Sequence, residues 1–170
     1  MAARVLMLIV AAAWLTSTNL AIAGGEPEFF HVGGKVLCQD CNQGYNEWIH
    51  GSKPIKGSKV SITCMDKRHR VIHYGSDETD EQGEYDITIS KYKNGKEVKP
   101  ELCTVRLVSS PDPVCNIFTN FGSGKSGVKL QRPSSVFRDL VKYTLGPFYC
   151  TLPMCEKPDT SENQEGEGSN

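Results

Sequence analysis

The sequence predicts an all-β protein, a small antiparallel β-barrel or sandwich of about seven strands stapled by disulfides. Apolar and polar residues alternate in several short runs, and glycine, proline and aspartate stand between these runs. This pattern is typical of strands with one buried face, separated by turns. The chain also contains seven cysteines. In a small secreted protein such cysteines form a disulfide framework, whereas in the cytosol they more often bind metal or act in redox chemistry.

The N-terminal residues predict the cellular compartment of the protein. Residues 1–23 have the features of a secretory signal peptide: Arg4, an apolar run over Val5–Leu15, and the small-residue cleavage signal Ala21-Ile22-Ala23. The apolar run is shorter than the roughly 20 residues that span a bilayer. We therefore expect a secreted protein in the extracellular space or cell wall, without a membrane anchor after cleavage.

The remainder divides into one domain and a tail. Residues 24–155 are long enough for a single β domain with its own core. Residues 156–170 hold five acidic residues and one lysine without a large apolar side chain. This composition predicts an acidic, disordered tail. The formal net charge of the whole chain is −1, which gives no reason to expect a nucleic-acid partner.

Three runs give the clearest strands. They are Lys59–Cys64, Tyr85–Ser90 and Cys103–Val108, each with apolar residues on one face. Weaker candidates lie at Val32–Cys38, Arg70–Tyr74, Val128–Leu130 and Tyr143–Tyr149. In the segment Pro133–Lys142 the apolar residues have helical spacing, and this spacing predicts one short helix packed on the sheets.

The cysteines are Cys38, Cys41, Cys64, Cys103, Cys115, Cys150 and Cys155, and their odd number leaves at least one thiol without an internal partner. Cys64 and Cys103 both lie on inward faces, which favours a bridge across the core. The rival hypothesis is a zinc site built from Cys38, Cys41, Cys150 and Cys155, or from His31, His50, His69 and His73. The secretory route and the lack of a second C-x-x-C argue against it, so we expect no metal and no cofactor.

Several blocks, taken in order, resemble the pollen Ole e 1 allergen and extensin family of secreted plant proteins. The blocks are Gly34–Cys41, Pro54–Val60 with Cys64, Thr79–Tyr85, Cys103–Cys115, and Gly146–Tyr149 before Cys155. The similarity covers residues 30–155. The chain departs from the family pattern at Gln39, Asn42 and Cys150, where the family favours aspartate, arginine and an aromatic residue.

The resemblance implies a disulfide-stapled β fold and a specific pairing. The six matching cysteines would pair as Cys38–Cys115, Cys41–Cys155 and Cys64–Cys103, leaving Cys150 as the unpaired thiol. The resemblance further implies a non-enzymatic, wall-associated protein that binds polysaccharide or protein partners during growth or development. We expect a monomer, with a Cys150-linked dimer as the alternative.

Two groups of charged residues remain to be interpreted. Basic clusters with nearby aromatic side chains predict weak, salt-sensitive binding of an acidic wall polysaccharide such as pectin. The candidate residues are Lys53, Lys56, Lys59, Lys91, Lys93, Lys96, Lys99, Tyr45, Trp48 and Tyr92. The acidic residues between Asp77 and Asp86 lack a calcium-loop pattern and predict a solvated hairpin end.

No catalytic motif stands out. Gly122–Gly127 lacks the first glycine of a phosphate-binding loop, because Thr119 stands at that position. The alternative function is a small secreted enzyme or enzyme inhibitor whose site is built from loops. A deep pocket with convergent carboxylates would favour this alternative, and a basic and aromatic surface would favour binding.

Overall fold

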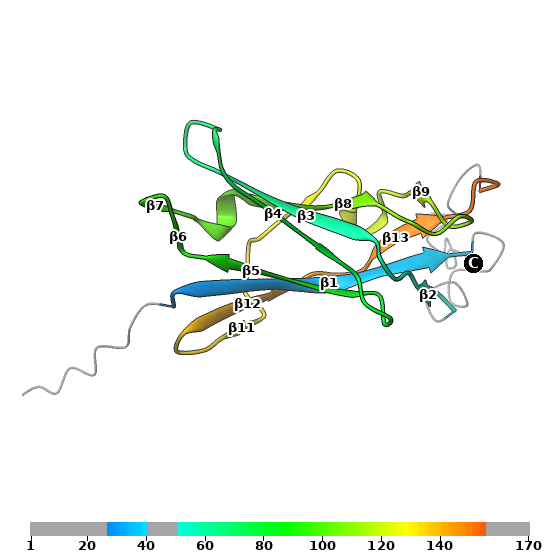
Figure 1. Cartoon of the computed structure of the whole chain (residues 1–170), viewed down its shortest axis with the longest axis horizontal. Helices are drawn as coiled ribbons and strands as arrows, with labels where there is room; N and C mark the ends of the chain where they lie inside the picture. Colours follow the sequence, from blue (N-terminus) through cyan, green and yellow to red (C-terminus); the bar gives the residue numbers. More distant parts are fainter. Residues whose placement is uncertain (1–26, 41–50, 156–170) are drawn as a thin grey trace, which may run out of the picture.

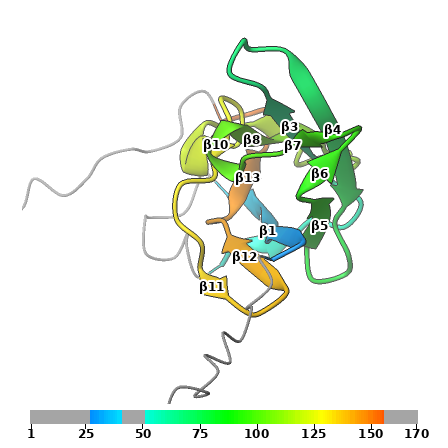
Figure 2. The ribbon, with the colours of Figure 1, turned by 90° about the vertical axis from the view of Figure 1, so that its left-hand side faces the viewer.

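A computed structural model describes residues 27–40 and 51–155, and they form two packed β-sheets (Figures 1 and 2). The predicted signal peptide and acidic tail lie outside these residues, as do Tyr45 and Trp48. In the described part, seven strands have four or more residues. They are β1 (Phe29–Gln39), β3 (Lys59–Met65), β4 (Val71–Glu78), β5 (Glu84–Ser90), β8 (Cys103–Ser109), β12 (Leu140–Thr144) and β13 (Phe148–Thr151).

Short elements complete the described chain. Six are two-residue strands: β2 (Lys53–Pro54), β6 (Tyr92–Lys93), β7 (Lys96–Glu97), β9 (Ile117–Phe118), β10 (Val128–Lys129) and β11 (Ser135–Val136). Two are 3₁₀ turns, η1 (Pro100–Leu102) and η2 (Phe121–Ser123). Neither of these turns approaches the length or apolar character that a membrane-crossing helix needs.

The larger sheet is built around β1. Its first half pairs with β5 on one side and β12 on the other, and its second half pairs with β2 and β13. The smaller sheet has the order β10-β8-β3-β4. Figure 2 shows the two sheets as separate layers, and Figure 1 shows the β6–β7 hairpin at one end of them. The described strands do not close on themselves, so of the two predicted architectures the sandwich describes the fold and the barrel does not.

Alternation explains why each strand has one buried face. On β5, Tyr85, Ile87 and Ile89 are buried while the residues between them are exposed. The facing sheet contributes Val60 and Ile62 from β3, with further apolar residues from β8, to the same core. The three clearest predicted strands are confirmed, each to within one residue at either end.

Two features of the larger sheet differ from the sequence prediction. The β1–β12 and β1–β13 ladders are parallel, whereas antiparallel pairing was expected throughout. The predicted helix over Pro133–Lys142 is wrong, because β11 and β12 form an antiparallel hairpin there. Val136 and Phe137 are 67% and 58% exposed, so their helical spacing does not reflect a buried face.

One described disulfide ties β1 to a loop, and another joins two neighbouring strands. Cys38 on β1 is bonded to Cys115, and Cys64 is bonded to Cys103, as the resemblance implies for both pairs. Cys64 and Cys103 are register partners on the neighbouring strands β3 and β8, with their Cα atoms 4.0 Å apart. The second bridge therefore lies within one sheet rather than across the core. Cys155 is also disulfide-bonded, and Cys41, its implied partner, lies outside the described residues.

Candidate functional site

The turn between β3 and β4 carries a compact group of basic side chains. Asp66 holds this turn, because its Oδ1 accepts hydrogen bonds from the backbone N–H of Arg68 at 2.9 Å and of Arg70 at 3.0 Å. Its Oδ2 accepts from the Arg70 guanidinium at 2.9 Å and 2.7 Å. These bonds hold the pKa of Asp66 down at about 2. Arg70 is thereby paired, while Lys67 and Arg68 project into solvent from a fixed backbone.

The β6–β7 hairpin brings more lysines to the same end of the molecule. Asn94 and Gly95 form its two-residue turn, and both have positive φ, as a tight hairpin of this kind requires. Lys93 and Lys96 flank this turn. Burial, and secondly the charge of Lys93, lower the pKa of His73 on β4. This influence of Lys93 on His73 agrees with Figures 1 and 2, where the β6–β7 hairpin lies beside the β3–β4 hairpin.

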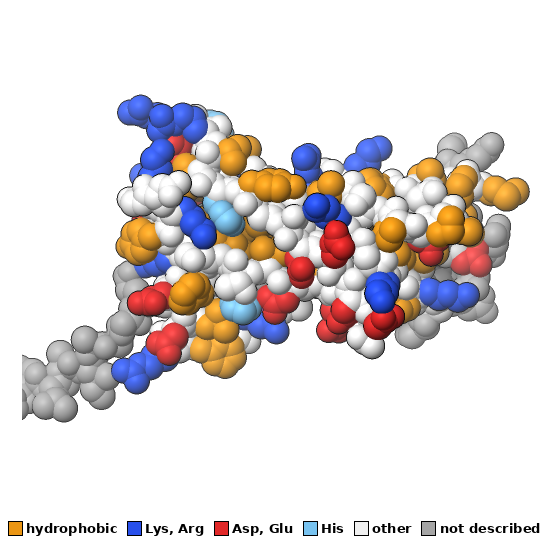
Figure 3. All heavy atoms as spheres, viewed as in Figure 1, with side chains coloured by type: hydrophobic (Ala, Val, Ile, Leu, Met, Phe, Trp, Pro, Cys, Tyr) orange, Lys and Arg blue, Asp and Glu red, His pale blue; other side chains and the backbone are white. Residues whose placement is uncertain are grey.

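We call Lys67, Arg68, His69, Arg70, Lys93 and Lys96 the basic end. Figure 3 shows lysine and arginine side chains gathered at this corner of the molecule, above the β6–β7 hairpin. Tyr74 and Tyr92, which belong to β4 and β6, are 56% and 59% exposed. The basic run at Lys67–Arg70 and the Asn94-Gly95 dipeptide are the sequence signals for this site, and strand alternation alone reveals neither.

The predicted binding lysines do not form one surface. Lys53 pairs with Cys38 near the far end of β1, whereas Lys91 follows Ser90, the partner of Phe29 at its start. Phe29 and Cys38 are nine positions apart along the strand, a distance of about 30 Å. Lys56 is ion-paired with Glu81, and Lys59 lies opposite Glu78 in the β3–β4 ladder. The fold therefore does not bring the two lysine clusters together on one surface.

Within the second cluster, the lysines differ in their partners. Lys91 and Lys99 both lie near Glu97, with Nζ to carboxylate distances of 3.9 Å and 3.8 Å. The Lys91 ammonium also lies 5.8 Å from the centroid of the Tyr92 ring. Among the residues of the basic end, Lys93 and Lys96 are free of such carboxylate pairs in the described structure. They are therefore better placed than Lys91 and Lys99 to attract an anion.

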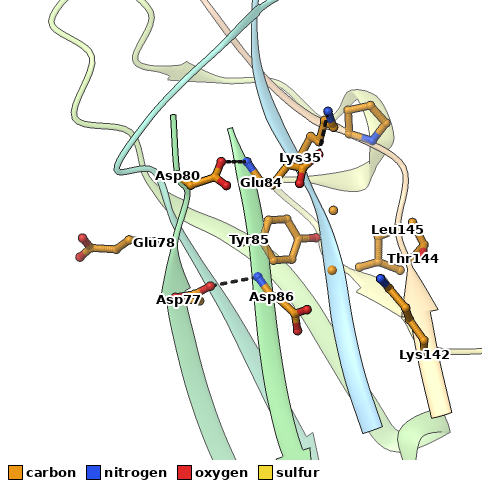
Figure 4. A pocket seen from close by; sticks show the side chains of 13 residues that line it. Lys35, Asp77, Glu78, Asp80, Glu84, Tyr85, Asp86, Lys142, Thr144 and Leu145 are labelled. Atoms are coloured by element: carbon orange, nitrogen blue, oxygen red, sulfur yellow. Dashed lines mark hydrogen bonds and ion pairs between the residues drawn. The ribbon is translucent and has the colours of Figure 1, made fainter. Parts of the chain in front are cut away.

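An open concavity of about 570 Å³ lies over the middle of β1 (Figure 4). Its acidic residues come from the predicted cluster, and several of their carboxylates are engaged. Asp77 accepts from the backbone N–H of Asp86 at 2.9 Å, and Glu84 is 2.9 Å from Lys35 Nζ. Asp80 accepts from two backbone N–H groups of its own turn. Within the described residues, no group of three or more potential ligands is placed to hold a metal ion.

Tyr85 passes beneath β1 at the floor of this concavity. A Cβ added to Gly34 would lie 2.7 Å from the Tyr85 hydroxyl oxygen, so only glycine leaves room for the ring. Burial raises the pKa of Tyr85 far above its usual range. The ring also stacks on Phe148 at 6.1 Å, which ties β5 to β13. Tyr85 is therefore a core residue whose role is packing.

Cys150 lies on β13, opposite Cys38 in the β1–β13 ladder. It is a free cysteine and is buried. Burial is the main cause that raises its pKa to about 11, so the thiol stays protonated and unreactive at neutral pH. A dimer linked through Cys150 would require this buried thiol to become exposed.

Comparison with known proteins gives consistent relatives, although no protein-family model matches the chain. A pistil-specific extensin-like protein of Nicotiana tabacum is 33% identical over 103 residues, 61% of this chain and 22% of the relative. An Olee1-like protein of Betula pendula is 33% identical over 111 residues, 65% of this chain and 62% of the relative. This chain thus spans less than two thirds of the length of either protein.

A third relative is matched over most of its length. The major pollen allergen Pla l 1 of Plantago lanceolata is 31% identical over 99 residues, which are 58% of this chain and 70% of the relative. The crystal structure of Pla l 1 superposes with a TM-score of 0.51 at 23% sequence identity, covering 74% of this chain and 94% of the allergen chain. On these relatives and this fold, the chain belongs to the pollen Ole e 1 allergen and extensin family of plant proteins.

Proposed function

We propose that this protein is a secreted, non-enzymatic component of the plant cell wall that binds anionic wall polysaccharide through its basic end. The observation that carries the proposal is the fixed turn at Asp66, which presents Lys67 and Arg68 from a rigid backbone. A pre-organised cationic surface pays less ordering entropy on binding than flexible lysines do. The names of the relatives, extensin-like and pollen proteins of plants, support the extracellular part of the proposal.

Binding is better supported than catalysis. A candidate general acid or base must have its carboxylate available to a substrate proton. In the concavity, the carboxylates of Asp77 and Asp80 are acceptors for backbone N–H groups, and Glu84 is paired with Lys35. The engaged carboxylates of Asp77, Asp80 and Glu84 therefore argue against these three residues as a general acid or base, and they do not bear on the inhibitor alternative.

Polygalacturonate is a suitable probe, because it is a linear polymer of uronic acids. We expect the purified protein to bind it at low ionic strength and to lose binding as salt screens the exposed charges. The double substitution Lys67→Gln/Arg68→Gln should weaken binding about tenfold, because two exposed ion pairs each contribute up to about 1 kcal/mol. Biolayer interferometry on immobilised polygalacturonate measures this change.

The matched control is Lys53→Gln/Lys59→Gln, which removes the same charge from the opposite end of the sandwich. We expect it to change the affinity less than twofold. Absence of binding at low salt would contradict the proposal. An equal loss in both double variants would also contradict it, because binding would then follow net charge rather than the basic end.

A further inference from the structure

Two adjoining hollows lie at the start of β1, next to the basic end. The larger, of about 360 Å³, is walled by Phe29 and Tyr92, and the smaller, of about 180 Å³, by Phe29, Phe30 and Tyr143. Pro27, Phe29 and Lys91 line both hollows. The Phe29 side chain is 42% exposed although it begins the central strand of the larger sheet. Tyr92 is 59% exposed in the larger hollow, whereas Phe30 and Tyr143 in the smaller hollow are 4% and 8% exposed, so Phe29 and Tyr92 are the rings open to a ligand.

The hollows carry two lysines and three carboxylates, because Glu28 lines the larger hollow and Glu97 and Glu101 line the smaller one. Lys91 and Lys99 both lie within 4 Å of the Glu97 carboxylate, and Glu101 lines the smaller hollow as well. Burial, and secondly the charge of Glu101, raise the pKa of Tyr143, and both residues line the smaller hollow. A uronate entering here would have to compete with Glu97 for the two lysines. The hollows therefore disfavour an anionic ligand, in contrast to the basic end.

The residues that line the two hollows favour some uncharged ligands over others. A pyranose ring has an apolar C–H face that stacks on an aromatic ring, and hydroxyl groups that both donate and accept hydrogen bonds. Its hydroxyls can donate to Glu97 and Glu101 and accept from Lys91 and Lys99. A proline-rich peptide would also pack on aromatic walls. Its proline residues, however, have no N–H to donate to the carboxylates.

We propose that the two hollows form adjoining subsites for two consecutive uncharged pyranose units of a glycan. This inference deepens the proposed function: the basic end attracts acidic stretches of a wall polysaccharide, and the hollows hold neutral units beside them. Phe29 lines both proposed subsites. Tyr92 lines only the subsite in the larger hollow.

The test is a titration with neutral β-1,4-linked gluco- and galacto-oligosaccharides, from the monosaccharide to the tetrasaccharide, followed by amide chemical-shift changes in NMR. About 1 M sodium chloride is present throughout, because a Debye length of about 3 Å suppresses binding at the basic end. Two subsites predict that affinity rises about tenfold from monosaccharide to disaccharide, and less than twofold with each further unit.

Three substitutions locate the site. Phe29→Ala should weaken disaccharide binding about tenfold. Tyr92→Ala should remove the gain between monosaccharide and disaccharide. Phe137→Ala is the matched control, because Phe137 is 58% exposed at the turn between β11 and β12 and lines neither hollow. Unchanged thermal unfolding of each variant shows that the fold is retained, since Phe29 pairs with its neighbours through the backbone.

The outcomes separate this inference from the proposed function. Retained disaccharide binding in Lys67→Gln/Arg68→Gln supports the subsites even if polygalacturonate binding fails. No shift with any neutral oligosaccharide overturns the inference and leaves the basic end untouched. Affinity that is equal in the wild type and in Phe29→Ala also overturns it. Tighter binding of a short polyproline peptide to the same amides would assign the hollows to a peptide instead.

Discussion

The two turns at the ends of β4 are built in the same way but carry opposite charge. In the first, Asp66 Oδ1 accepts from the backbone N–H groups two and four residues later, those of Arg68 and Arg70. In the second, Asp80 Oδ1 accepts from Gln82 and Glu84 at the same two offsets. The backbone bonds also correspond, since the N–H three residues after each aspartate donates to the aspartate carbonyl.

The turns differ in the side chains that these shared backbones present. The residue four positions after the aspartate is Arg70 in the first turn, where it pairs back onto Asp66. It is Glu84 in the second, where it reaches across to Lys35. Glu84 and Glu81 of the second turn are thus paired with Lys35 on β1 and with Lys56 between β2 and β3, whereas Lys67 and Arg68 of the first turn are exposed. The same aspartate-anchored turn can therefore carry either basic or acidic side chains. The charge of each turn is set by its side chains and not by its backbone conformation.

The largest expected effect comes from a substitution that strains the backbone conformation shared by the two turns. The third residue after the aspartate has positive φ in both turns: 70° at Gly83 and 58° at His69. Gly83→Ala should lower the free energy of unfolding by at least about 2 kcal/mol, because an L-residue is strained at this φ. The added Cβ would also lie 2.7 Å from the carbonyl oxygen of Val36. Urea denaturation measures the loss.

The reverse substitution is the control for this prediction. His69→Gly relieves the same strain in the exposed turn, and we expect it to change stability by less than about 1 kcal/mol. A loss after His69→Gly as large as that after Gly83→Ala would show that the two backbones are not equivalent.

A smaller effect tests the anchor of the basic turn. The folded pKa of Asp66 is about 2, below its ordinary value of 3.8. Its contribution to stability is therefore fully present above about pH 4 and is lost as the pH falls from there to about 2. Asp66→Asn should reduce the loss of stability between pH 5 and pH 2, as measured by urea denaturation at several pH values.

The loss of stability at low pH will be smaller in Asp66→Asn but will not disappear. Backbone N–H groups of Cys115 and Val114 lower the pKa of Asp112 as well, and its contribution remains. The difference between wild type and variant isolates Asp66. Identical pH profiles for the two proteins would show that the aspartate does not anchor the turn in solution.

The smallest effect concerns His73 on β4, whose pKa responds to the charge of Lys93 in the β6–β7 hairpin. Burial and the charge of Lys93 lower the pKa of His73 below 6.5. The folded protein then binds fewer protons than the unfolded chain near pH 6, so this group lowers stability as the pH falls through that range. NMR titration of the imidazole should give a midpoint below 6.5. Lys93→Gln should raise this midpoint only in part, because burial is the larger cause, and an unchanged midpoint would place Lys93 too far away to matter.

Local patterns in the sequence predicted the strands well and their partners less well. Alternation located β3, β5 and β8, because each has one fully buried face. It could not reveal the parallel ladders of β12 and β13, since the side-chain period of a strand is the same in parallel and antiparallel pairing. Helical spacing misled at residues 133–142, because exposed apolar residues can match a period without packing.

The candidate site was predictable in its residue types and not in its location. The lysines of the β6–β7 hairpin were identified, but their neighbours from the β3–β4 turn are separated from them by more than twenty positions of sequence. Lys56 was also identified, yet Glu81 meets it from a turn that only the folded sandwich brings close. Whether a surface lysine is free or paired depends on such long-range neighbours.

The parallel pairing of β1 with the last strands affects how the chain can fold during synthesis. The Thr151 hydroxyl on β13 donates to the carbonyl of Gln39 on β1, across 112 positions of sequence. A chain emerging from its N-terminus can therefore form the smaller sheet early, whereas one edge of β1 has no partner until β12 and β13 have been translated. Contacts of such separation form slowly, and the exposed edge is open to pairing with other chains in the meantime. A chain that stops before Phe148 leaves part of that edge uncovered permanently.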